Sequence, residues 1–198
     1  MEKNTIAAFD FDGTITTKDT FSEFVIFSKG HCRFLLGILI YSPLLIAYKL
    51  NLYPNWKVKE KLFSFFYKST EEVEFIRWGE AFSAKIDTIT RPAAMEAIKK
   101  HKAESAVVII VSASIDVWIK PWAEKAGVDA VLATQFETDE NRRLTGKFRT
   151  KNCCEKEKAN RIKAAFPNRE AYRLVAYGNS KGDKVMIEFA DKGWYRPF

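Results

Sequence analysis

The sequence predicts an α/β fold in which a parallel sheet carries helices on both faces and a helical segment is inserted after the first strand. Short apolar runs alternate with longer helical patterns, which is typical of strand–helix–strand units. The first two strong runs, residues 5–11 and 107–111, are separated by about a hundred residues. A crossover between parallel strands needs only about a dozen residues. We therefore expect most of the intervening segment to form a domain of its own.

The expected strands are short and apolar. Residues 107–111 (VVIIV) are β-branched throughout and form the strongest candidate. Such runs suit a Rossmann-like sheet that is buried on both faces. A polar stretch flanked by Phe136 and Phe148 predicts a β-ribbon attached to this sheet. The four strand runs are residues 5–11, 107–111, 130–133 and 174–177.

The expected helices divide into those that cover the sheet and those of the insert. In the insert, Thr20-Phe21-Ser22-Glu23 has the pattern of a capping box that begins a helix. The predicted domains are a core of residues 1–15 and 88–198 and a helical cap of residues 16–87. The other helical patterns cover residues 56–67 and 75–86 in the cap, and 93–102, 117–125 and 155–165 in the core.

Charge limits the choice of partners. The chain of 198 residues has a net charge of +7, which favours phosphorylated metabolites, anionic lipid or nucleic acid. Residues 29–68 hold seven Lys or Arg and one acid, Glu60, and so carry +6 by themselves. The sequence has no RNA-binding aromatic motif and no helix-turn-helix signal, so we expect no nucleic-acid partner. Nothing in the sequence indicates an oligomeric state.

Other function classes fit the sequence poorly. Neither of the two histidines, His31 and His101, lies in a metal-ligand pattern, which argues against a zinc hydrolase. No Gly-x-x-x-x-Gly-Lys loop of an NTPase is present. Three cysteines without a CxxC pair, and an apolar strand pattern close to Met1 without a leader, argue against a disulfide framework. We expect a cytoplasmic protein.

Residues 34–48 (FLLGILIYSPLLIAY) form a run of fifteen residues without a charge, closed by Arg33 and Lys49. The run is shorter than the roughly 20 apolar residues that span a bilayer, and Pro43 interrupts it. The main expectation is a buried pair of core helices within the cap. The alternative is a surface that meets a membrane or a lipid tail, with the flanking cations facing headgroups. That alternative would place the protein peripherally at the inner membrane.

Two carboxylates follow the first strand. Asp10 and Asp12 leave the strand in the same direction, at the edge of a parallel sheet where ligands usually bind. Because carboxylates this close repel one another, we expect a cation beside them. Mg²⁺ fits, since it prefers one or two carboxylates together with phosphate oxygens. Gly13 allows a tight turn directly after the pair.

The element from Asp10 to Thr14, Asp-Phe-Asp-Gly-Thr, resembles the first motif of the haloacid-dehalogenase superfamily of hydrolases. The resemblance implies that Asp10 attacks phosphorus and forms an aspartyl-phosphate. It implies that Asp12 protonates the leaving oxygen and then activates water. It also implies that both residues bind Mg²⁺, Asp12 through its backbone carbonyl.

The second and third motifs follow in the expected order. Ser112 follows the β-branched strand, and the resemblance implies that its hydroxyl and the Ala113 amide bind a phosphate oxygen. Lys158 matches the third motif and would balance charge on the nucleophile and the transferring phosphoryl group. Lys156 is an alternative candidate for that role.

The fourth motif spans residues 176–183 and follows another apolar strand. The family usually has Asp where Asn179 stands. Asn179 still offers a carbonyl oxygen to a metal, and Asp183 keeps the second acid. The resemblance therefore implies a Mg²⁺ site made by Asp10, Asp12, Asn179 and Asp183, with weaker binding than usual because one negative charge is missing.

The insert matches the cap of the phosphoserine-phosphatase-like branch of the superfamily. Asp19-Thr20-Phe21, the apolar cap run and the final residues 194–198 resemble a bacterial subgroup that includes phosphatidylglycerophosphate phosphatase C. The cap is basic and apolar, which favours a lipid phosphate or another amphiphilic monoester over phosphoserine. Two alternatives stay open: a phosphatase for a small soluble metabolite, and a non-catalytic relative that binds anions.

Overall fold

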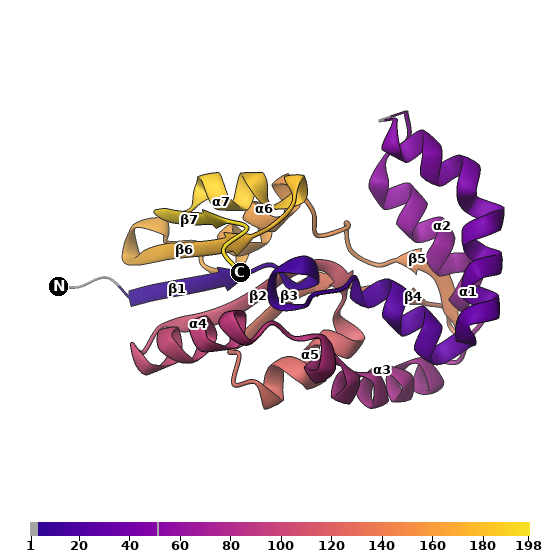
Figure 1. Cartoon of the computed structure of the whole chain (residues 1–198), viewed down its shortest axis with the longest axis horizontal. Helices are drawn as coiled ribbons and strands as arrows, with labels where there is room; N and C mark the ends of the chain where they lie inside the picture. Colours follow the sequence, from indigo (N-terminus) through magenta and orange to yellow (C-terminus); the bar gives the residue numbers. More distant parts are fainter. Residues whose placement is uncertain (1–3, 51) are drawn as a thin grey trace.

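The computed structural model describes residues 4–50 and 52–198 and has a parallel sheet at its centre (Figure 1). The five strands of this sheet lie in the order β3–β2–β1–β6–β7, and neighbouring strands are parallel throughout. The predicted α/β fold is confirmed. The strands are β1 (Asn4–Phe9), β2 (Val107–Ile115), β3 (Ala130–Thr134), β6 (Tyr172–Gly178) and β7 (Lys192–Tyr195).

Both faces of the sheet are buried because successive residues of the central strand β1 point to opposite sides. Ile6 and Ala8 belong to one hydrophobic cluster, which also contains Ile109 of β2. Ala7 and Phe9 belong to the other cluster. Since each side of the strand meets apolar neighbours, the sequence shows a continuous apolar run here.

Two pairs of helices cover these faces (Figure 1). On one face, α4 contributes Ile98 and α5 contributes Trp118 to the first cluster. On the other face, α6 contributes Ile162 and α7 contributes Met186. Three of these helices were expected from the sequence, and the short α7 was not. Their bounds are α4 (Pro92–Ala103), α5 (Asp116–Lys125), α6 (Lys156–Ala165) and α7 (Lys184–Phe189).

The inserted segment forms three helices joined to the core by aromatic contacts. Phe24 of α1 stacks on Trp118 of α5 with 4.4 Å between ring centroids. Gly79 of α3 lies so close to α5 that an added Cβ would be 2.6 Å from the Val117 carbonyl oxygen. In Figure 1, α1 and α2 project beyond the sheet while α3 runs beside α5. The helices are α1 (Thr20–Lys49), α2 (Asn55–Tyr67) and α3 (Glu72–Ile86).

The first turn of α1 differs from the predicted capping box. Asp19, not Thr20, is the N-cap, and its carboxylate accepts a hydrogen bond from the Ser22 amide at 2.8 Å. Asp is as good an N-cap as Ser or Thr. Thr20 is thus free to donate from its hydroxyl to Asp12 at 2.6 Å, and Glu23 pairs with Lys18 at 2.9 Å.

The apolar run of residues 34–48 lies within one helical segment of α1 rather than in a buried pair of helices. The backbone of α1 breaks once, at Gly30 with φ +81°, and then continues through Pro43. Pro43 lacks the N–H that would bond the Leu39 carbonyl, and the Ser42 hydroxyl donates to that carbonyl at 2.8 Å instead. Leu39 is 71% exposed, and many of its apolar neighbours are exposed as well. The expectation that residues 34–48 form a buried pair of core helices is therefore wrong.

Length and composition single out α1 in another way. Of the helices within residues 4–50 and 52–198, it alone is long and apolar enough to cross a membrane by those two criteria. The core helix of a soluble protein passes the same test when it is mostly buried. The apolar part of α1 is mostly exposed, so α1 is not a buried core helix of this kind.

Two further strands complete the fold. β4 (Phe136–Thr138) and β5 (Leu144–Phe148) form the predicted antiparallel ribbon, with Phe136 paired to Phe148. The edge strand β7 was not predicted, because Lys192–Tyr195 has exposed side chains and no apolar run. It pairs with β6 and so flanks the strand that leads to Asn179.

Candidate active site

The site lies at the carboxyl ends of β1, β2 and β6. β1 ends at Phe9, and the chain then turns tightly through Phe11–Ile15. Gly13 adopts φ +81°, and an added Cβ would lie 2.1 Å from the side-chain nitrogen of Asn179. Glycine is therefore required here both by the backbone angle and by the close approach of the segment after β6.

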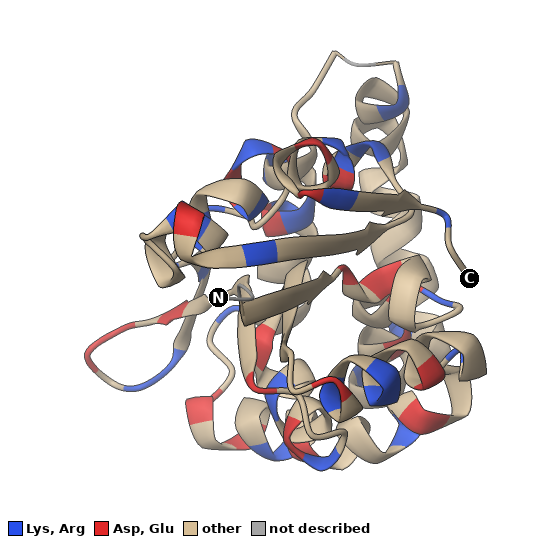
Figure 2. Cartoon of the chain, turned by 90° about the vertical axis from the view of Figure 1, so that its left-hand side faces the viewer, with Lys and Arg blue, Asp and Glu red and all other residues tan. Residues whose placement is uncertain are grey.

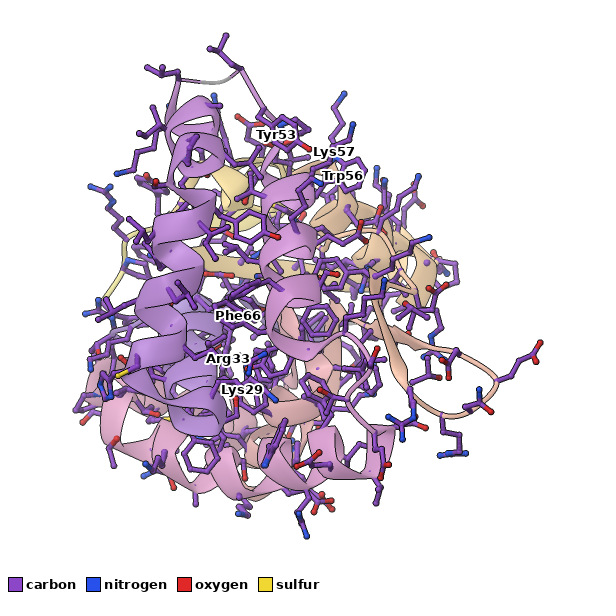
Figure 3. All side chains as sticks on the ribbon, turned by 90° about the vertical axis from the view of Figure 1, so that its right-hand side faces the viewer. Lys29, Arg33, Tyr53, Trp56, Lys57 and Phe66 are labelled. Atoms are coloured by element: carbon purple, nitrogen blue, oxygen red, sulfur yellow. The ribbon has the colours of Figure 1, made fainter. Side chains whose placement is uncertain are left out.

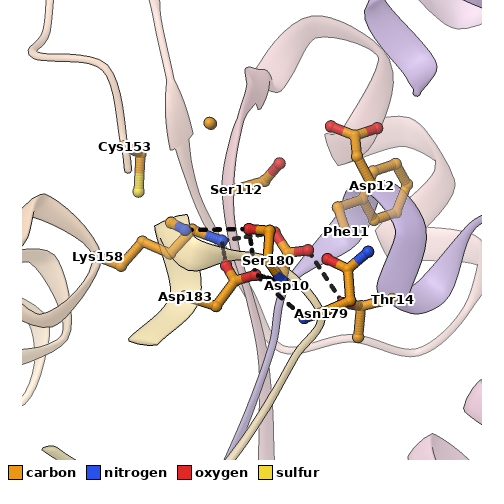
Figure 4. A network of polar contacts seen from close by, with 12 residues as sticks. Asp10, Phe11, Asp12, Thr14, Ser112, Cys153, Lys158, Asn179, Ser180 and Asp183 are labelled. Atoms are coloured by element: carbon orange, nitrogen blue, oxygen red, sulfur yellow. Dashed lines mark hydrogen bonds and ion pairs between the residues drawn. The ribbon is translucent and has the colours of Figure 1, made fainter. Parts of the chain in front are cut away.

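Lys158 joins two carboxylates from distant parts of the chain (Figure 4). Its ammonium nitrogen lies 2.5 Å from Asp10 Oδ1 and 2.5 Å from Asp183 Oδ1. Lys158 is only 2% exposed, so the ion pairs are shielded from water. Lys156, the alternative candidate, is exposed on the same helix.

Each ionisable group of this triad has a displaced pKa. Burial raises the pKa of Asp10 to about 6, against the opposing effect of Lys158. Burial alone would lower the pKa of Lys158, but the two carboxylates outweigh it and hold that pKa above its ordinary value. Burial would likewise raise the pKa of Asp183, but Lys158 and the hydrogen bonds from Ser180 together outweigh it and lower the pKa.

Asp183 is fixed by the segment that follows β6. Its second oxygen, Oδ2, accepts hydrogen bonds from the Asn179 amide at 3.1 Å, the Ser180 amide at 2.8 Å and the Ser180 hydroxyl at 2.7 Å. Both oxygens of Asp183 are therefore used within the protein. The structure places Asp183 as the residue that holds Lys158 against Asp10.

Asp12 points toward the start of α1 and the end of β2. Its Oδ1 accepts from the amide and the hydroxyl of Thr20 at 2.8 and 2.6 Å, and its Oδ2 accepts from the Ser114 hydroxyl. Burial raises the pKa of Asp12. A carboxyl group with a raised pKa beside the nucleophile candidate suits general acid and base catalysis.

The carboxyl end of β2 connects the site to α2. Ser112 is fully buried, and its hydroxyl accepts a hydrogen bond from the Ser114 amide at 3.0 Å. The carbonyl of Ala113 accepts from Lys59 of α2 at 2.9 Å and from Thr134 at 3.0 Å. Lys59 is thus the cation of the insert that reaches the catalytic edge.

The oxygen donors suit a hard divalent cation. Asn179 Oδ1 is buried and has no hydrogen-bond partner in the described part of the chain, and the Asn179 carboxamide faces the Asp10 carboxylate in Figure 4. A buried oxygen without a partner is costly unless something binds it. Mg²⁺ accepts one carboxylate and neutral oxygens when phosphate supplies the rest.

The predicted four-residue metal site is brought together only in part. Asp10 and Asn179 lie side by side, whereas both oxygens of Asp183 are used by Lys158, Asn179 and Ser180. The Asp12 carboxylate is bonded to Thr20 and Ser114, and this leaves its backbone carbonyl as the group expected to bind Mg²⁺. Within residues 4–50 and 52–198, no three His, Cys, Asp or Glu side chains are grouped closely enough to hold a metal. Any Mg²⁺ site here depends on Asp10, Asn179 and backbone or substrate oxygens.

A cavity of about 400 Å³ opens at these groups and continues along the insert. At one end it is lined by Asp10, Asp12, Ala113, Lys158 and Asp183. At the other end it is lined by apolar side chains of α1 and α2. These include Phe34, Ile38, Leu45, Tyr48, Leu62 and Phe66.

Two charged residues of this cavity were not expected from the sequence. Asp19 and Lys59 both line it, and Lys59 also lowers the pKa that Asp12 would otherwise have. Asp19 could have been found as an acid directly before the insert helix. Lys59 is one of seven cations in its segment, and nothing in the local pattern distinguishes it.

Known proteins resemble this chain over most of its length. A family model described as haloacid dehalogenase-like hydrolase matches residues 7–188. Protein CicA of Caulobacter vibrioides is 32% identical over 194 residues, which cover 98% of this chain and 86% of that protein.

Solved structures share the fold. A protein of unknown function from Bordetella pertussis Tohama I superposes with a TM-score of 0.80 at 18% identity, covering 95% of this chain and 87% of that one. A substrate-bound phosphoserine phosphatase superposes with a TM-score of 0.68 at 21% identity, covering 98% and 86%. These two structures show that the fold is shared, and the family match over residues 7–188 shows that the chain belongs to the haloacid dehalogenase-like hydrolases.

Proposed function

We propose that this hydrolase is a phosphatase acting on amphiphilic phosphomonoesters, including lipid-linked ones. The observation that carries the proposal is that one and the same cavity has a charged end at Asp10 and Lys158 and an apolar end at α1 and α2. A substrate with a phosphate head and a hydrocarbon tail fits both ends at once. The lipid class was the expectation drawn from the basic, apolar cap.

The charged end can transfer a phosphoryl group in two steps. An oxygen of Asp10 attacks phosphorus, the ester bond to the leaving oxygen breaks, and Asp12 gives that oxygen a proton. Asp12 then takes a proton from water, which attacks phosphorus and releases inorganic phosphate and free Asp10. Ser112 and the Ala113 amide would hold phosphate oxygens.

Lys158 offsets negative charge during these steps because it stays protonated beside Asp10. Asp183 keeps the Lys158 ammonium group in place. Mg²⁺, held by Asp10, Asn179 and the Asp12 carbonyl, would supply further positive charge to the phosphoryl oxygens.

The apolar end would bind the tail of the substrate. Ile38 and Phe34 come from α1, and Leu62 and Phe66 come from α2. Burying one methylene group contributes about 0.8 kcal/mol. A tail that enters this end should therefore raise affinity by up to about fourfold for each methylene group until the cavity is filled.

A series of linear alkyl phosphates, used below the concentrations at which they form micelles, tests this directly. We expect Mg²⁺-dependent phosphate release whose kcat/KM rises with chain length, and no release by Asp10→Asn. Ile38→Ser should flatten the rise while leaving the shortest ester unchanged. A kcat/KM that is independent of chain length would contradict the amphiphilic substrate but not the phosphatase chemistry.

A second candidate is a phosphatase for a small amino-acid phosphate. Asp19 and Lys59 both line the cavity, and such a substrate needs an acid for its amino group and a cation for its carboxylate. Phosphoserine tested beside the alkyl series decides between the two. Under this second candidate, Asp19→Asn and Lys59→Gln would each raise KM for phosphoserine and leave KM for butyl phosphate much less changed. If no phosphate is released from any of these esters, the protein is better explained as a non-catalytic relative that binds anions.

A further inference from the structure

The outer face of α1 is a continuous apolar surface. Helical periodicity divides the second half of α1 into two sides. The inner side lies against α2, since an added Cβ at Gly37 would be 2.3 Å from the Phe66 ring, and the Tyr41 and Phe65 ring centroids are 5.7 Å apart. The side chains of the outer face point away from α2. They are Leu35, Leu36, Leu39, Ile40, Ile46 and Leu50.

No element within residues 4–50 and 52–198 covers this face. Leu39 is 71% exposed and Leu35 and Leu50 are 63% exposed each, so they contribute little to the stability of the fold as described. Single exposed leucines are ordinary, but a contiguous exposed apolar patch marks a surface that meets a partner or a membrane. The question is which of these partners fits.

The charges around the face point to an anionic partner. The sequence has no Asp or Glu from residue 24 to residue 59, a stretch that contains all of the outer face. Arg33 lies near its lower end and Lys57 near its upper end (Figure 3), and Lys49 directly precedes Leu50 in the sequence. The core helices differ, because they carry both signs interspersed (Figure 2).

Aromatic side chains at the tip complete the pattern. Trp56 is half exposed, and the Lys57 ammonium nitrogen lies 5.4 Å from its ring centroid and 6.0 Å from that of Tyr53. Trp and Tyr next to Lys are typical of the boundary between headgroups and acyl chains. Leucines flanked by cations, with an aromatic rim, match an anionic bilayer surface.

We propose that the outer face of α1 docks on an anionic lipid bilayer and lies within its interface. Leu39 and Ile40 would enter the acyl boundary, while Lys49 and Lys57 contact headgroups. This inference goes beyond the proposed function and does not require it, because the outer face is separate from the residues that line the cavity.

The geometry favours an interfacial position over a spanning one. The break at Gly30 leaves nineteen residues, 31–49, as the uninterrupted helical part of α1, and α2 packs along its inner side. α2 carries Lys59, whose ammonium group is bonded to the Ala113 carbonyl of the core. Insertion of α1 across a bilayer would have to separate it from α2 or carry the charged residues of α2 inside.

Sedimentation of the full chain with vesicles tests the proposal. We expect binding to vesicles of phosphatidylcholine with phosphatidylglycerol, weak binding to phosphatidylcholine alone, and a loss of binding as salt increases. Leu39→Glu should lower the partition coefficient by about tenfold or more. Val73→Glu is the matched control, since Val73 on α3 is 72% exposed and lies on another face.

A charge pair gives a second comparison. Lys49→Gln combined with Lys57→Gln should weaken binding to the anionic vesicles, and Lys99→Gln combined with Lys100→Gln on α4 should not. Circular dichroism and turnover of a soluble aryl phosphate check that Leu39→Glu stays folded. Wild-type vesicle binding without any phosphate release would contradict the proposed function and leave the docking intact.

Three results would overturn the docking proposal. The first is equal vesicle binding by Leu39→Glu and Val73→Glu. The second is equal binding to neutral and anionic vesicles. The third is a dimer in sedimentation equilibrium that Leu39→Glu dissociates, with no vesicle binding by the wild type, which would assign the outer face to a second copy of the chain.

Discussion

The Lys158 ammonium group lies 2.5 Å from Asp183 Oδ1, and both side chains are almost fully buried. Asp183 in turn accepts three hydrogen bonds through its other oxygen, from Asn179 and Ser180. The cation that faces Asp10 is therefore held by the segment after β6 as well as by its own helix. This arrangement makes Lys158 a residue on which both stability and activity depend.

Lys158→Met should abolish turnover and destabilise the protein. The substitution leaves Asp10 and Asp183 buried without their cation, and removing one partner of a buried ion pair costs about 3–5 kcal/mol. Urea unfolding measures the loss. Lys156→Met, on the exposed side of the same helix, should change the free energy of unfolding by less than about 0.5 kcal/mol. Similar losses for both variants would contradict the role of the triad.

Gly13→Ala should impair both folding and the site. The backbone has φ +81°, and the new Cβ would lie 2.1 Å from the Asn179 side chain. Gly127 is the matched control, with φ +72° and no atom within 4 Å of an added Cβ. Gly127→Ala should cost only the backbone strain of about 1–2 kcal/mol and keep kcat, whereas Gly13→Ala should cost more and lose activity. Equal effects on thermal unfolding and kcat would show that the contact with Asn179 is unimportant.

Asn179→Asp should tighten binding of Mg²⁺. The substitution adds a negative charge where a buried oxygen without a partner faces Asp10, and we expect the dissociation constant to fall by about tenfold or more. Titration calorimetry with Mg²⁺ alone measures this without turnover. Asn168→Asp, at an exposed position, should leave the dissociation constant unchanged. An unchanged value for Asn179→Asp would place the ion elsewhere.

His101 should make stability depend on pH. Its ring packs against Phe9, and its Nε2 lies 2.9 Å from the Tyr177 hydroxyl oxygen. Burial lowers the pKa of His101 from the ordinary value of 6.5. The unfolded chain therefore binds more protons between the folded pKa and about 6.5, so the free energy of unfolding falls as the pH drops through that window.

Urea unfolding of the wild type and His101→Gln at pH 7.5 and pH 5 checks this sign. The wild type should lose more stability than the variant between the two pH values. Glu104 and Lys100 are the nearest charged groups and act in opposite directions. His31→Gln, at an exposed position, is the control and should follow the wild type. A variant that loses as much as the wild type would assign the pH dependence to other groups.

Local patterns predicted the central strands and helices well because each is encoded within ten residues or so. The apolar runs at β1, β2 and β6 predicted the fold. The order of the motifs predicted that Asp10, Asp12 and Lys158 lie at one edge of the sheet. The edge strand β7 has no such run, since its side chains are exposed.

The cap contribution to the site was less predictable. Thr20 satisfied the capping pattern, yet its hydroxyl donates to Asp12, eight residues earlier, and the capping pattern does not contain that contact. Lys59 of α2 donates to the Ala113 carbonyl near the end of β2, 54 residues later in the chain, and no local pattern contains that contact. The burial of residues 34–48 was predicted wrongly because apolar composition alone does not distinguish a core helix from one that faces outward.

The pairing of β1 has a consequence for folding kinetics. Ile6 aligns with Val107 of β2 and Leu174 of β6, each at least a hundred residues later in the chain. Closing such long loops precedes any gain from strand pairing, and folds dominated by distant contacts acquire their native state slowly. The α1–α2 hairpin can collapse early, since its partners are close in sequence. Its exposed leucines would then be present before the sheet exists, and slow refolding with aggregation at high protein concentration is the expected behaviour.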